Sequence, residues 1–160
     1  MMVQVFIAFI GGNLLFDFRA NGIPISTAAF ILGLIAVTIN SGAYVSEIIR
    51  SGIESISKGQ IEAGRSLGLS QSLTMRKIVF PQAVKNILPA LGNEFITIIK
   101  ETSVVSVIGT ADLMYNTNIV KGNSFRPMEA LIISAIMYFV ITFTLSLILR
   151  VFERRMKESD

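Results

Sequence analysis

Runs of apolar residues that are long enough to cross a lipid bilayer constrain this chain more than any other feature. A bilayer core needs about 20 mostly apolar residues per helix. Ile25 to Ile49 and Met128 to Leu149 meet that length. Ile87 to Gly109 is also long enough but carries charged residues, and Val3 to Phe16 falls short and is interrupted by glycines. The sequence therefore predicts an all-α, polytopic transmembrane helix bundle of about four spans.

Composition agrees with this interpretation and argues against an enzyme. Hydrophobic residues make up 52% of the chain and charged residues 16%, against roughly 25% charged in an ordinary soluble protein. Histidine and cysteine are absent, which removes the commonest general base and metal ligand and any disulfide. The sequence has no phosphate-binding G-x-x-x-x-G-K-[ST] motif. We predict no catalytic, metal-binding or cofactor-binding residue.

Basic residues predict how the chain is oriented in the membrane. They gather in the segment between the second and third apolar runs and again after the fourth, at Arg50, Lys58, Arg65, Arg76, Lys77, Lys85, Arg150, Arg154, Arg155 and Lys157. Such residues accumulate on the cytoplasmic side. The segments 17–24 and 110–127 have few and are expected outside. The sequence thus predicts a multi-pass plasma-membrane protein, and topology explains the net charge of +3 better than nucleic-acid binding does.

The polar segment of about 54–81 is predicted to form two short helices joined by a turn. Ser57 opens a Ser-x-x-Gln capping box. Gly68 suits the left-handed position that ends a helix, and Ser70 is placed to cap the next one. Pro81 is expected to stop that second helix.

One face of the first short helix consists mainly of small residues. Ile61, Gly64, Leu67 and Gly68 recur at helical spacing. A basic surface helix can lie on lipid headgroups, but small residues offer little apolar area to bury there. They allow another backbone to approach closely instead. Protein docking is therefore favoured over lipid docking, and both remain open.

Polar residues also interrupt the second and third spans. At helical spacing they share one face of each span, and they are Asn40, Tyr44, Glu47, Asn93, Glu94, Thr97, Lys100 and Glu101. Ionisable groups in a bilayer cost at least about 2.5 kcal/mol each and usually face a bundle interior or an aqueous pathway. Two interpretations are open: these eight polar residues line a solute pathway, or they pair with one another between helices. Eight polar positions exceed what helix adhesion needs, which favours the pathway.

The polar segment resembles the hallmark of a known family, the membrane-spanning permease subunits of ATP-binding-cassette (ABC) importers. That hallmark is Glu-Ala-Ala, three residues, Gly, nine residues and Ile-x-Leu-Pro. Here it stands as Glu62-Ala63-Gly64, Gly68 and Ile78-Val79-Phe80-Pro81, with two substitutions of the same chemical class. The polar amino acid uptake branch is indicated by Asn40–Ile53, Ser57–Gln60, Asn93–Ile96, Lys100–Ser103, Ser106–Gly109 and Phe125–Pro127.

The resemblance implies a role for each part of the chain. Residues 1–155 would form one transmembrane domain, and 156–160 a cytoplasmic tail. The loop would couple to a separate ABC ATPase through Glu62, Ala63, Gly64, Gly68, Ile78 and Pro81. A second permease subunit, identical or related, would complete the pathway in the lipid bilayer. An extracytoplasmic amino-acid-binding protein would deliver the solute.

The start of the chain departs from the family pattern. Members normally have one more span before the one that begins here, so we expect the domain to be incomplete at its N-terminus. This departure supports an alternative to an importer subunit, namely a non-transporting membrane scaffold or an inactive remnant of such a permease. A membrane enzyme is disfavoured because no nucleophile and base can be named.

Overall fold

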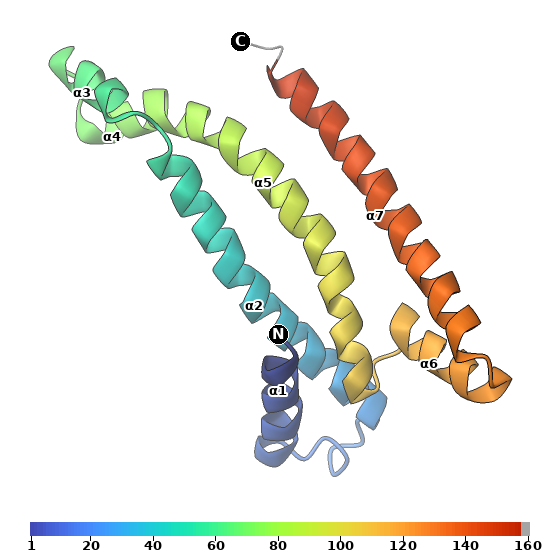
Figure 1. The fold of residues 1–160 in the computed structure, drawn as a ribbon. Helices are drawn as coiled ribbons and strands as arrows, with labels where there is room; N and C mark the ends of the chain where they lie inside the picture. Colours follow the sequence, from blue (N-terminus) through green and yellow to red (C-terminus); the bar gives the residue numbers. More distant parts are fainter. Residues whose placement is uncertain (158–160) are drawn as a thin grey trace. The chain divides into compact units, whose positions relative to one another are not determined.

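The computed structural model describes residues 1–157, and this part of the chain is helical with no strand (Figure 1). The predicted all-α fold is confirmed. Besides seven α-helices, the described residues form one π-helical turn (η1) and one 3₁₀ segment (η2). In chain order they are α1 (Met2–Leu15), α2 (Ile25–Glu54), α3 (Lys58–Ser66), α4 (Gln71–Thr74), η1 (Met75–Val79), α5 (Phe80–Glu101), η2 (Thr102–Ile108), α6 (Leu113–Ser124) and α7 (Pro127–Lys157).

The chain divides into two compact units, which are described separately. The first unit comprises Met1–Gly42 and Ile96–Leu145. The second comprises Ala43–Phe95 and Ser146–Asp160. Because the dividing points fall inside α2, α5 and α7, each of these long helices contributes to both units.

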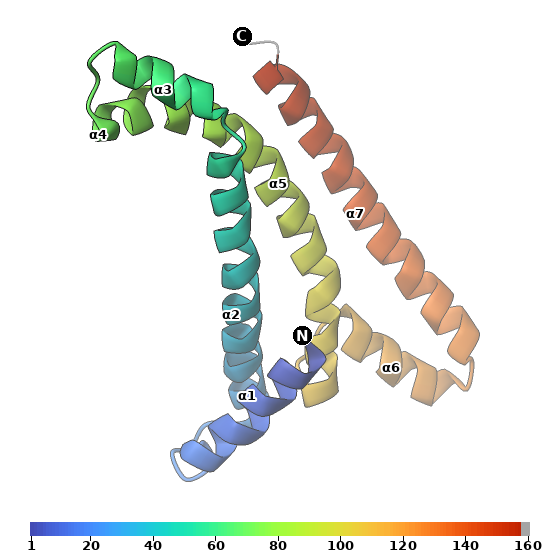
Figure 2. The same ribbon diagram turned by 60° about the vertical axis from the view of Figure 1, so that its left-hand side comes forward.

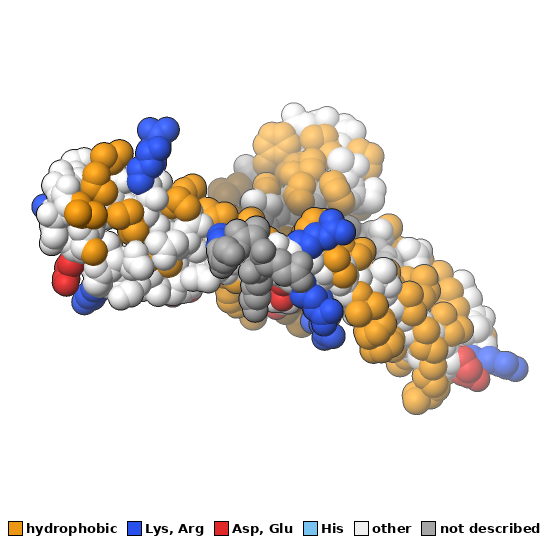
Figure 3. Space-filling view, turned by 90° about the horizontal axis from the view of Figure 1, so that it is seen from above, with side chains coloured by type: hydrophobic (Ala, Val, Ile, Leu, Met, Phe, Trp, Pro, Cys, Tyr) orange, Lys and Arg blue, Asp and Glu red, His pale blue; other side chains and the backbone are white. Residues whose placement is uncertain are grey.

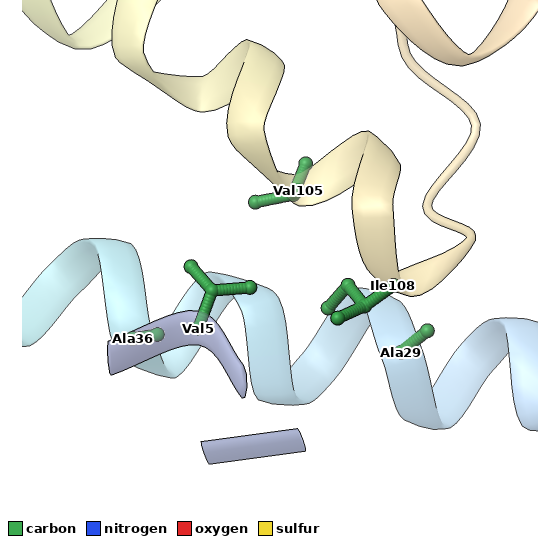
Figure 4. Packing of buried hydrophobic residues seen from close by; sticks show 5 residues of the cluster. All are labelled: Val5, Ala29, Ala36, Val105 and Ile108. Atoms are coloured by element: carbon green, nitrogen blue, oxygen red, sulfur yellow. The ribbon is translucent and has the colours of Figure 1, made fainter. Parts of the chain in front are cut away.

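The core of the first unit lies where α1 and η2 pack on the N-terminal half of α2. Small side chains on α2 let the bulkier residues of its neighbours approach, and Gly33 serves the same purpose: a Cβ there would lie 3.3 Å from Ile108 Cδ1. Figure 4 shows the buried side chains together, and they are Val5, Ala29, Ala36, Val105 and Ile108. This cluster fixes the position of η2 and of the segment that leads from it into α6.

The core of the second unit joins the C-terminal end of α2 to η1 and α5. Its buried residues are Ile56, Val79, Ala83 and Ile87. Ala83 is fully buried, and α2 carries Gly52 opposite Ile87. A Cβ at position 52 would lie 2.3 Å from Ile87 Cγ1, which is closer than two carbon atoms can approach. The absence of a side chain at Gly52 is therefore what permits this helix crossing.

Two of the four predicted spans lie in helices that are long and apolar enough to cross a membrane. Windows in α2 and α7 have mean hydropathies of 1.8 and 2.4. Only 6% of the α7 window is buried within the protein, so its apolar surface needs lipid or another helix to cover it. Figure 3 shows hydrophobic side chains, in orange, over much of the visible surface. The shorter α1 is also apolar.

The third predicted span does not form one regular helix. Its α-helical part, α5, ends at Glu101 and is followed by the 3₁₀ segment η2, which ends at Gly109 with φ +86°. Hydrogen bonds in a 3₁₀ segment close tighter rings, and such segments are common at the C-terminal ends of α-helices. The predicted range of Ile87 to Gly109 thus contains a change of helix type.

Other helix boundaries differ from the predicted ones. The helices α2 and α7 continue past the predicted span ends at Ile49 and Leu149. Within the predicted outer loop the chain forms α6, because Asp112 Oδ1 accepts a hydrogen bond from the Tyr115 amide at 2.7 Å and caps the helix. Residues 158–160 of the predicted tail lie outside the described residues.

Candidate functional site: a polar helical hairpin

The segment that resembles the importer hallmark forms a compact helical hairpin, residues 58–79, within the second unit (Figure 2). Its first arm is α3. The predicted capping box at Ser57 is wrong, because the serine side chain makes no capping hydrogen bond. The Gln60 amide, which the box would have bonded, donates instead to the backbone carbonyl of Ser57 at 3.0 Å. The backbone turn satisfies this amide without a side chain.

The first arm ends at the glycine that the sequence singled out. Gly68 has φ +83°, a left-handed conformation in which glycine has no steric cost. Its amide donates to the Arg65 carbonyl at 3.0 Å, and the Leu69 amide donates to the Gly64 carbonyl at 3.2 Å. These two bonds are the Schellman pattern. The predicted backbone role of Gly68 is confirmed, and the turn of the hairpin is fixed by hydrogen bonds.

The second arm begins as predicted and ends differently. Ser70 caps it, since its hydroxyl accepts a hydrogen bond from the Leu73 amide at 3.3 Å. The expectation that Pro81 stops this helix is wrong, because the π-helical turn η1 leads directly into α5. Proline lacks an amide and crowds the carbonyl four residues before it. A π turn shifts the bonding by one residue, as in the Phe80 amide to Met75 carbonyl bond, so the helix tolerates the ring.

Gly64 holds the two arms together. It is buried, and a Cβ at this position would lie 2.7 Å from Ile78 Cδ1 and 3.1 Å from Thr74 Cγ2. Glu62 and Ala63 are exposed. The hallmark residues therefore divide into two groups: Gly64, Gly68 and Ile78 shape the hairpin, whereas Glu62 and Ala63 lie on its surface.

The surface of the hairpin carries exposed apolar side chains. Leu67, directly before the turn, is 82% exposed, and Leu73 and Met75 are 40% and 42% exposed. Leu67 lies on the helix face that the sequence predicts, but it is not one of the hallmark residues. A leucine at a polar, hydrogen-bonded turn is the signal that points to it, because such a side chain contributes nothing to the hairpin core. The exposed Leu67 side chain is therefore available to contact a partner protein.

The predicted substrate-pathway residues belong to both units. Asn40, Thr97, Lys100 and Glu101 lie in the first unit, and Tyr44, Glu47, Asn93 and Glu94 lie in the second. Glu47 forms an ion pair with Arg50 of the same helix, with an N–O distance of 2.7 Å. Both side chains are more than half exposed, so the pair adds little stability. Glu47 thus pairs along α2 and not between helices. The pathway remains a prediction.

Two helices long and apolar enough to cross a membrane, in a chain that also forms a polar helical hairpin, are features expected of an integral membrane protein. Residues 1–158 match the family described as "Binding-protein-dependent transport system inner membrane component". The chain belongs to this family.

Relatives and a solved structure agree. The chain is 40% identical over 134 residues to a putative glutamine transport system permease protein of Rickettsia bellii, covering 84% of this chain and 62% of the relative. It is 44% identical to the Escherichia coli glutamine transport system permease protein, with coverages of 80% and 58%, and 38% identical to the Bacillus subtilis arginine transport system permease protein, with coverages of 100% and 70%.

In three dimensions the chain is similar to a protein in the crystal structure of an amino acid ABC transporter with histidines. The TM-score is 0.83 and the sequence identity 47%, over 96% of this chain and 68% of that one. The chain spans about three fifths of the length of the first Rickettsia relatives.

Proposed function

We propose that this chain belongs to the permease subunit of an ATP-driven importer of polar amino acids and that the hairpin couples it to a separate ABC ATPase. The observation that carries this proposal is the hairpin itself. Its arms pack closely at the interior Gly64 and its turn is hydrogen-bonded, while Glu62, Ala63 and Leu67 are exposed. A preformed surface of this kind binds a partner with a smaller loss of conformational entropy than a loop that becomes ordered only on binding.

The second arm provides a route by which a movement of the hairpin would be transmitted to the long helices. Helical structure is continuous from Gln71 through η1 to Glu101, so no loop separates the hairpin from α5. In the second-unit core the start of α5 packs against the C-terminal end of α2. Closure of the ATPase would therefore move the hairpin and these helix ends together, biasing the permease between two states of access.

The remaining parts of the proposal rest on the basic-residue pattern and the relatives. The hairpin and C-terminus are cytoplasmic, an extracytoplasmic binding protein delivers the solute, and a second permease subunit completes the pathway. Relatives named for glutamine and arginine transport suggest polar substrates. The polar residues predicted on the second span, such as Asn40, and on the third span, such as Glu94 and Lys100, would each supply polar contacts for them. Neither the fold nor the relatives favours the scaffold or inactive remnant.

A transport assay tests the proposal. Proteoliposomes would contain the chain with its candidate ATPase and binding protein, and the accumulation of labelled glutamine and of arginine would be followed with ATP inside or outside. ATP-dependent accumulation of either amino acid is expected. Formation of the complex without any accumulation would favour the scaffold.

Replacing Leu67 with serine is expected to weaken ATPase binding without altering the fold. The side chain is 82% exposed and makes no contribution to the hydrophobic cores, so stability should change by less than about 0.5 kcal/mol. Loss of an apolar anchor at an interface typically costs about 2 kcal/mol, or roughly thirtyfold in Kd. Surface plasmon resonance against the immobilised ATPase measures this change.

The control is Phe125→Ser, which removes an equally exposed apolar side chain, 88% accessible, from the end of α6. It should leave the Kd unchanged. Equal losses in both variants would show that Leu67 is no anchor.

A further inference from the structure

The turn between α6 and α7 holds an aromatic residue in an unusual backbone conformation (Figure 1). Phe125, directly after α6, has φ +56°, and among the described residues it is the only residue other than glycine with a positive φ. This left-handed conformation has a steric cost for any residue with a Cβ, and glycine is the usual occupant at the end of a helix. A phenylalanine that persists in such a position is expected to contribute through its side chain.

The side chain of Phe125 does not contribute to the interior of this chain, because it is 88% exposed. The backbone around it is held by hydrogen bonds. The Arg126 amide donates to Ser124 Oγ at 3.3 Å, and the Ala130 amide donates to the Arg126 carbonyl at 3.3 Å. An apolar ring on a hydrogen-bonded turn is thus presented to whatever surrounds the protein.

Charged residues place this turn at a membrane boundary. Residues 130–149 of α7 contain no charged side chain, and at 1.5 Å per residue they extend about 30 Å, the thickness of the hydrocarbon core of a bilayer. Arg126 and Glu129 precede this stretch, and Arg150 follows it. If the uncharged stretch crosses the hydrocarbon, Phe125 lies at the level of the lipid headgroups.

The apolar surface beside Phe125 continues along α7. Met128 and Ile132 are one helical turn apart and both are exposed. Only 6% of the most apolar window of α7 is buried within the protein. Because the exposed ring adjoins a helix surface that suits lipid, and sits where the bilayer would end, the bilayer surface is favoured over a protein partner as its surroundings.

The two residues of the turn match the chemistry of that surface. Aromatic and other apolar side chains bury themselves in the boundary between headgroups and acyl chains. Arg126 is exposed next to Phe125, and a guanidinium group binds phosphate oxygens in a fork geometry. A phospholipid offers both an apolar region and a phosphate at this depth.

We propose that Phe125 inserts into the lipid interface at the boundary of α7, with Arg126 against the phosphate groups. Insertion of the ring holds the α6–α7 turn on the bilayer and offsets the steric cost of its left-handed backbone. The contact is independent of the hairpin and of the ATPase.

Tryptophan fluorescence tests the proposal, because the chain contains no tryptophan of its own. The full chain with Phe125→Trp would be reconstituted into phosphatidylcholine vesicles. The acyl chains would carry bromine, which quenches tryptophan on close contact, either near the carbonyl groups or near the methyl ends. We expect the emission to shift to shorter wavelength than in water, with a greater loss of intensity for bromine near the carbonyl groups.

Two matched variants complete the experiment. Leu67→Trp places the probe at another highly exposed apolar position, in the hairpin, and should be neither shifted nor quenched. Phe139→Trp, in the middle of the uncharged stretch of α7, should be quenched more by bromine near the methyl ends.

Three results would overturn the proposal. The first is an unquenched, water-like emission from Phe125→Trp, including one that changes only when a binding protein is added, which would make the ring a protein contact. The second is equal quenching of Leu67→Trp and Phe125→Trp, since the effect would then follow exposure alone. The third is the absence of quenching in Phe139→Trp, which would remove lipid from α7.

Discussion

The Gly64→Val substitution is expected to open the hairpin and to abolish binding of the ATPase. The first added carbon alone would lie 2.7 Å from Ile78 Cδ1 and 3.1 Å from Thr74 Cγ2, and the branches of valine would enter the same space. Overpacking of this kind costs about 1–3 kcal/mol. A hairpin of two short helices has little stability to spare, so the arms should separate. Limited proteolysis of residues 58–79 and ATPase binding would measure the two consequences.

The adjacent Ala63→Val substitution provides the control. Ala63 is exposed on the same helix, so this substitution introduces the same β-branched side chain on the surface without an interior clash. Protease resistance should be unchanged, whereas ATPase binding is expected to fall only modestly because the surface contact is altered. If both variants resist protease as well as the native chain does, Gly64 is not what closes the hairpin.

The second large effect is expected from Gly52→Val, at the crossing of α2 and α5. Since a Cβ would lie 2.3 Å from Ile87 Cγ1 in the second-unit core, one of the helices must shift. We expect a loss of about 1–3 kcal/mol and a lower melting temperature in detergent, by roughly 3–10 °C for a chain of this size. Thermal unfolding of the purified chain measures the change.

Gly42→Val is the matched control on the same helix, because a Cβ at Gly42 would meet nothing within 4 Å. It should leave the melting temperature within about 2 °C of the native value. Shortening the clashing side chain, in the double variant of Gly52→Val with Ile87→Ala, should recover part of the loss. An equal loss for Gly42→Val and Gly52→Val would mean that the crossing is not the sensitive feature.

Much of the fold follows from local sequence signals. The apolar runs that became α2 and α7 are long enough that few other structures can satisfy their backbones in lipid. Gly68 and Ser70 were predictable because each acts through its own neighbours, by a left-handed φ and by a cap. These signals depend on a few residues that lie close together in the chain.

The remaining features depend on contacts that the sequence does not display. A serine followed three residues later by glutamine allows a capping box, but here the Gln60 amide donates its hydrogen bond to the backbone carbonyl of Ser57 and not to the serine side chain. Proline usually ends a helix, yet the π turn before Pro81 made room for it. The inward position of Gly64 depends on Ile78, fourteen positions further along the chain. Only the packed structure distinguishes it from the exposed Ala63.

The most direct test of the account is whether the hairpin binds an ATPase subunit. The native chain, the Gly68→Arg variant and the Gly122→Arg variant would each be co-purified in detergent with the candidate ATPase. Both glycines have open space around them, but only Gly68 has a positive φ and lies in the hairpin. Retention of the ATPase by the native chain and by Gly122→Arg, with its loss from Gly68→Arg, is the predicted result. Undiminished retention by Gly68→Arg would contradict the account.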